Sequence, residues 1–195
     1  CDECGSNLKP VKDASDQITK QKSPPVATRK EIITTETPTI NGERKHVTVL
    51  FSDLTGYSAI SEQLDPEEVK EITSQIFNEI SKIIYKYDGF IEKFAGDAVM
   101  ALFGATKSHE DDPVRAIHAA REIHNIVKSL SPKYEKKIEH PLSMHTGINT
   151  GLVVTGEINL KTGIHGVAGE AINVAARLGD LAQAGEIMVA SDTYY

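Results

Sequence analysis

Hydrophobic and polar residues follow two distinct periods from about residue 46 onward, and these periods predict the secondary structure. Apolar residues at helical spacing predict three helices, which begin at Asp65-Pro66, within 109–113 and at Glu170. Gly96-Asp97 and Asn149-Thr150-Gly151 each separate two predicted strands and are typical of turns. Runs of β-branched and apolar residues predict strands at 47–51, 90–95, 98–103, 142–148, 152–158 and 186–190.

The order of these elements predicts an α+β fold. It is β-α-β-β-α-β followed by β-α-β, and its first six elements match the ferredoxin-like or polymerase-palm arrangement. We expect an antiparallel-containing sheet with helices covering one face. The other face must then be covered by a partner or serve as a platform.

Residues 1–42 show neither the helical nor the strand periodicity of hydrophobic residues. The only two cysteines, Cys1 and Cys4, form a CxxC motif that predicts half of a zinc ribbon within residues 1–8, with a redox pair or two idle thiols as alternatives. Residues 9–42 are rich in Lys, Ser, Thr and Pro and predict a flexible linker. The folded catalytic domain is expected over 43–195.

Charge and composition exclude several classes of function. The 195 residues carry a net charge of −7, and because residues 1–45 carry +1, the predicted domain is strongly acidic. Duplex-binding domains are usually basic, so no nucleic-acid partner is expected. No apolar run is long enough to cross a membrane and no secretory signal is visible, which predicts a cytoplasmic protein. The chain begins with Cys rather than Met, so we expect a fragment of a longer protein.

Two carboxylates are placed to bind metal. Asp53 follows the first predicted strand and Asp97 lies in the hairpin turn, so pairing of that strand with the hairpin would bring both to one end of the sheet. Together with the backbone carbonyl of Leu54, they could hold Mg²⁺ or Mn²⁺ beside nucleotide phosphates. The alternative is that Asp53 is a cap and Asp97 only a turn residue. Phosphate could be bound by the backbone amides of Thr55, Gly56 and Tyr57.

A polar pair lies on the third predicted helix. Asn173 and Arg177 are four residues apart and therefore share a face. They point either into a cleft or simply into solvent.

Several motifs together resemble the signatures of class III adenylyl/guanylyl cyclases. They are 49–57 (VLFSDLTGY), 92–97 (EKFAGD), 147–151 (GINTG) and 169–178 (GEAINVAARL). The pattern is most similar to bacterial cyclases of the soluble-adenylyl-cyclase type. A zinc ribbon often precedes the cyclase domain in that group and further regulatory domains often follow it.

The resemblance implies an adenylyl cyclase that converts ATP to 3′,5′-cyclic AMP and pyrophosphate for intracellular signalling. The ribose 3′-oxygen would attack the α-phosphate in line, with two Mg²⁺ or Mn²⁺ ions per site. It also implies a head-to-tail homodimer with shared sites. One chain would supply Asp53 and Asp97 for the metals, and the other Lys93 for adenine with Asn173 and Arg177 for ribose and phosphate.

The sequence departs from the family pattern at three places. Gly166 occupies the second base-selecting position, where a side-chain acceptor is usual, and His145 stands where some members carry a phosphate-binding Arg. The chain stops at Tyr195, before a C-terminal hairpin that family members carry. The alternatives are therefore a catalytically silent nucleotide-binding or dimerisation module, a guanylyl cyclase, or another palm enzyme such as a diguanylate cyclase.

Overall fold

The structure is a computed structural model that describes residues 43–156 and 166–194. No helix in these two ranges combines the length and apolar character needed to cross a membrane. The strands are β1 (Glu43–Thr55), β2 (Phe90–Ala95), β3 (Ala98–Phe103), β4 (Ser143–Thr155), β5 (Val167–Ala168) and β6 (Ile187–Val189). The helices are α1 (Tyr57–Gln63), α2 (Pro66–Lys86), α3 (Asp112–Ile138), α4 (Glu170–Leu181) and α5 (Ser191–Tyr194).

The strands of the described ranges form one mixed sheet, which confirms the predicted α+β class. Its order is β2-β3-β1-β4-β5, and β6 also pairs with β4. All pairings are antiparallel except β4 with β6, which is parallel. The predicted hairpin of β2 and β3 is confirmed, and β1 lies beside it as the palm arrangement requires.

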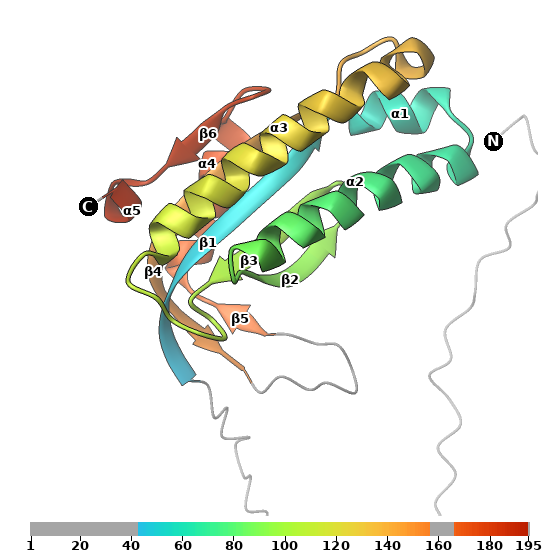
Figure 1. Cartoon of the computed structure of the whole chain (residues 1–195). Coiled ribbons are helices and arrows are strands. Elements are labelled where there is room, and N and C mark those ends of the chain that lie inside the picture. Colours follow the sequence, from blue (N-terminus) through green and yellow to red (C-terminus); the bar gives the residue numbers. More distant parts are fainter. Residues whose placement is uncertain (1–42, 157–165, 195) are drawn as a thin grey trace, which may run out of the picture. The chain divides into compact units, whose positions relative to one another are not determined.

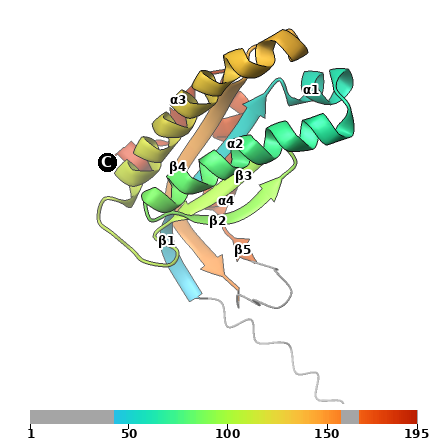
Figure 2. The same ribbon diagram turned by 45° about the vertical axis from the view of Figure 1, so that its right-hand side comes forward.

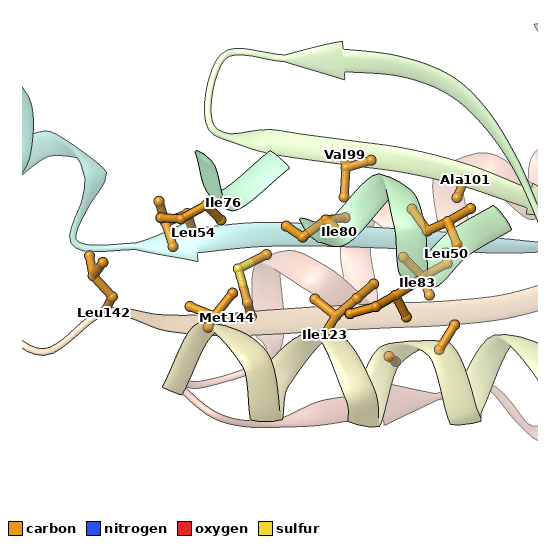
Figure 3. Close-up of a cluster of buried hydrophobic side chains, with 14 of the residues drawn as sticks. Leu50, Leu54, Ile76, Ile80, Ile83, Val99, Ala101, Ile123, Leu142 and Met144 are labelled. Carbon is orange, nitrogen blue, oxygen red and sulfur yellow. The ribbon is translucent and has the colours of Figure 1, made fainter. Parts of the chain in front are cut away.

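Helices α2 and α3 run side by side across one face of the sheet (Figures 1 and 2). The isoleucines of α2 recur every three or four residues, so they form one apolar stripe that packs on the sheet. Figure 3 shows this core between strands and helices, with Leu50 of β1, Ile80 of α2, Ile123 of α3 and Met144 of β4 all buried. Burial of each such side chain stabilises the fold by about 1.5–3 kcal/mol.

Helix α4 packs on the opposite face, over β4 and β1. Its buried residues Ala171 and Ala175 join a second apolar cluster with Val49 of β1 and Val153 of β4. Small residues on α4 allow its backbone to come close to the strands. Two of the three predicted helices, α2 and α3, thus cover one face of the sheet, whereas the third predicted helix, α4, lies on the face that was expected to be open.

The prediction of two strands around Asn149-Thr150-Gly151 is wrong. All three residues lie within β4, which is a single strand of 13 residues. Asn149 pairs with Val49 across the sheet, and its side-chain Nδ2 donates to the carbonyl oxygen of Ala171. A Cβ at Gly151 would lie 3.0 Å from the Cβ of Ala171, so this glycine allows α4 to approach and makes no turn.

The predicted end of the first strand also needs correction. Strand β1 continues through Asp53 to Thr55, because its ladder with β4 extends to the pair Thr55 and Ser143. Asp53 is therefore a strand residue rather than a helix cap. Its position within a paired strand fixes the backbone from which its carboxylate projects.

Candidate active site

The structure brings Asp53 and Asp97 to the same end of the sheet. Asp53 pairs with Ala98, the residue after Asp97, and the Leu54 amide donates to the Asp97 backbone carbonyl at 3.2 Å. Asp53 projects from the face that carries α4, because side chains alternate along a strand and Phe51 packs in the cluster beneath α4. The backbone carbonyl of Leu54 lies on the side of β1 that faces the hairpin.

The surroundings of Asp53 favour a bound cation. Burial, followed by the negative charge of Asp97, raises the pKa of Asp53 above its usual range. In the described ranges no lysine or arginine forms an ion pair with either carboxylate. Two neighbouring carboxylates without a lysine or arginine partner are a donor set that fits Mg²⁺ or Mn²⁺.

His145 is the basic side chain next to this pair. It pairs directly with Asp53 between β4 and β1, and its Nε2 lies 3.6 Å from Oδ2 of Asp53. Its Nδ1 lies 2.8 Å from the carbonyl oxygen of Gly179 in α4. His145 therefore links the carboxylate to the last turn of α4.

The segment predicted to bind phosphate leads from β1 into α1. Gly56 has φ of 93°, a left-handed conformation that glycine adopts without strain, and Tyr57 begins α1. Among the described residues, Thr55 has a buried Oγ1 without a hydrogen-bond partner.

The two predicted base-selecting residues, Lys93 and Gly166, have different surroundings. Lys93 pairs with Met100 and so lies on the α4 face of the sheet, where it is exposed. The carbonyl of Gly166 already accepts a hydrogen bond from the Gly156 amide at 2.6 Å.

The polar pair on α4 points away from its own sheet. Ala171, Ala175 and Gly179 are the buried residues of α4, whereas Asn173 and Arg177 are exposed. An offset of two residues along a helix is a rotation of about 200°, so the two sets face opposite directions. The structure thus brings Asp53, Leu54 and Asp97 together within one chain. Asn173 and Arg177 of the same chain point away from the sheet that carries them.

Two features of this site were missed from the sequence. Asp180 contributes a further negative charge that acts on Asp53, after Asp97. Its spacing of three residues from Arg177 and seven from Asn173 places it on the same stripe of α4, which is a signal the sequence contained. The contact of His145 with Gly179 has no sequence signal, because it depends on how α4 packs.

Across residues 43–156 and 166–194, no group of three or more His, Cys, Asp or Glu side chains is arranged to hold a metal ion. A metal at Asp53 and Asp97 would complete its coordination with the Leu54 carbonyl, water or ligand oxygens. Cys1 and Cys4, the predicted zinc half-site, lie outside the described residues.

Comparison with known proteins places the chain in a family. Residues 41–195 match the family described as the adenylate and guanylate cyclase catalytic domain. The chain belongs to this family.

Solved structures of cyclases share both the fold and part of the sequence. The adenylyl cyclase CyaB from P. aeruginosa is 35% identical with a TM-score of 0.73, over 78% of this chain and 80% of that chain. The guanylyl cyclase Cya2 is also 35% identical, with a TM-score of 0.72 over 78% of each chain. Adenylate cyclase 1 of Rhizobium meliloti is 29% identical over 136 residues, which is 69% of this chain and 20% of that protein. The chain spans less than a third of the length of the curated relatives that it matches.

Proposed function

We propose that the chain is an adenylyl cyclase that converts ATP to 3′,5′-cyclic AMP and pyrophosphate in intracellular signalling. The observation that carries this proposal is the convergence of Asp53 and Asp97 at one end of the sheet without a lysine or arginine partner among the described residues. Such a pair suits a divalent cation that would in turn bind nucleotide phosphates.

The active sites are shared between two chains in a head-to-tail homodimer. Arg177 and Asn173 are exposed and point away from the sheet that carries Asp53, so one chain does not place all of these groups around one substrate. In the dimer, Arg177 and Asn173 of one chain face the Asp53 and Asp97 of the other. This arrangement also covers the part of the α4 face that α4 leaves open.

Each residue then has a chemical role. Asp53, Asp97 and the Leu54 carbonyl hold two Mg²⁺ or Mn²⁺ ions, which when bound would supply charge neutralisation and lower the pKa of the ribose 3′-hydroxyl. The amides of Thr55, Gly56 and Tyr57 bind phosphate oxygens. Asn173 orients the ribose so that its 3′-oxygen lies in line with the α-phosphate, and Arg177 stabilises the charge that develops there.

Base selection rests on Lys93. Its ammonium donates to N1 of adenine, but it can also donate to O6 of guanine. Gly166 offers no side-chain acceptor for the adenine amino group, and its carbonyl is already engaged by Gly156. A guanylyl cyclase is therefore the second candidate, consistent with equal identity to CyaB and Cya2.

The test is cyclic-nucleotide formation from ATP and from GTP, measured separately with Mn²⁺ and with Mg²⁺ over a range of protein concentrations. Cyclic AMP at a rate per chain that rises with concentration supports a dimeric adenylyl cyclase. Cyclic GMP as the main product supports the second candidate. Binding of ATP without any cyclic product contradicts both and indicates a silent nucleotide-binding module.

A further inference from the structure

His145 is held in the orientation of a metal-binding histidine. Its Nδ1 lies 2.8 Å from the carbonyl oxygen of Gly179. A carbonyl can only accept a hydrogen bond, so Nδ1 carries a proton and donates it. The fixed ring then directs Nε2 toward Oδ2 of Asp53, 3.6 Å away. Histidines that bind metals typically donate their other ring N–H to a backbone carbonyl in this way.

We propose that His145 Nε2 is a ligand of the divalent metal that binds at Asp53. Ligand atoms that share one ion at about 2.1 Å lie roughly 3 to 3.4 Å apart, so a small rotation of the Asp53 carboxylate suffices. The inference rests on the proposed function, because it concerns the same metal site. It adds a nitrogen ligand that an arginine at this position cannot provide, since a guanidinium has no lone pair to donate.

The consequence is a preference among metals. Mg²⁺ favours oxygen ligands, whereas imidazole nitrogen suits later divalent metals and is accepted by Mn²⁺. The protein should therefore bind Mn²⁺ more tightly than Mg²⁺, and the difference should depend on His145.

The competing arrangement is an ion pair, in which Nε2 also carries a proton and His145 acts as a cation beside Asp53. In that arrangement the imidazole cannot contact the metal through nitrogen. Electron spin-echo spectroscopy of bound Mn²⁺ separates the two, because a directly bound ¹⁴N modulates the echo.

The experiment uses the 195-residue protein with Mn²⁺ and inorganic pyrophosphate, which adds phosphate oxygens but no nitrogen. The wild-type protein should show ¹⁴N modulation from imidazole. His145→Gln should lose it and weaken Mn²⁺ binding by about tenfold or more, as for loss of metal-site partners. His46→Gln, an exposed histidine at the far end of the same sheet, is the matched control and should retain both.

Bound Mn²⁺ without ¹⁴N modulation in the wild-type protein overturns the proposal and needs no variant that might fail to fold. Modulation that survives in His145→Gln overturns it as well. Cyclic-nucleotide formation by the same wild-type sample shows in either case that the proposed function stands without this ligand. Absence of both bound Mn²⁺ and cyclic product would contradict the proposed function itself.

Discussion

Gly147 of β4 lies directly against the backbone of Gly179 in α4. A Cβ on Gly147 would overlap the Gly179 nitrogen and the Ala175 carbonyl oxygen, and would lie 2.8 Å from the Leu178 carbonyl carbon. The obstructing atoms are all backbone, so no side-chain rotation relieves the overlap. This contact sets the height of α4 above the sheet and with it the positions of Asn173 and Arg177.

Replacing Gly147 with Ala should therefore lift α4 and destabilise the fold. Overpacking of a close contact costs about 1–3 kcal/mol. Gly166→Ala is the matched control, because nothing lies within 4 Å of a Cβ at that position. Urea unfolding of both variants measures the difference, and equal stability of Gly147→Ala and wild type would contradict the role given to this contact.

Asp53→Asn should separate stability from activity. Burial and the charge of Asp97 raise the pKa of Asp53, so its folded form binds a proton more readily than its unfolded form. Protonated Asp53 therefore contributes to stability below the unfolded pKa, and this contribution is lost as pH rises through the folded pKa. At neutral pH the ionised carboxylate without bound metal lowers the free energy of unfolding. The metal-free variant should melt at a higher temperature than wild type, while cyclase activity is nearly abolished. A lower melting temperature for Asp53→Asn in EDTA would contradict the like-charge argument.

Lys93→Glu should change the preferred base. Glutamate can accept from N1 and N2 of guanine but cannot donate to N1 of adenine. We expect the ratio of kcat/KM for ATP to that for GTP to fall by about tenfold or more. Lys70→Glu, at an exposed position on α2, makes the same charge change and should leave the ratio unaltered. An unchanged ratio in Lys93→Glu would remove Lys93 from base selection.

The sequence could predict the fold wherever local pattern decides the structure. The stripe of α2, the hairpin at Gly96-Asp97 and the placement of Asp53 beside Asp97 all follow from short-range periodicity and strand order. The pattern failed at Asn149-Thr150-Gly151, because polar and small residues there serve contacts with α4 rather than a turn. The link from His145 to Gly179 could not be predicted, since it joins residues 34 apart through the docking of a helix.

His124 should make stability depend on pH. Its Nε2 lies 2.8 Å from the Thr146 hydroxyl, which in turn lies 2.7 Å from the hydroxyl of Ser52. Burial lowers the pKa of His124, so the unfolded chain takes up its proton first as the pH falls below about 6.5. The stability that neutral His124 provides is therefore present above that pH and lost as the pH falls toward the folded pKa.

In His124→Gln the loss of unfolding free energy between about pH 7.5 and pH 5.5 should be smaller than in wild type, as linkage requires. His140→Gln, at an exposed position, should keep the wild-type dependence. If wild type and His124→Gln lost the same unfolding free energy over this pH range, another group would govern the pH dependence of stability.

Mixing two inactive variants should restore activity if the sites are shared. Asp97→Ala lacks part of the metal site and Arg177→Ala lacks the charge supplied from the opposite chain, so each homodimer contains two defective sites. A heterodimer concentrates both defects in one site and leaves the other intact. Random pairing of equal amounts makes half of the dimers heterodimers, so about a quarter of wild-type activity should return. Mixing Asp53→Ala with Asp97→Ala is the control and should restore nothing, because both changes affect the same half of the site. Failure of the first mixture to recover, with exchange of chains verified by mass spectrometry of tagged proteins, would refute the shared site.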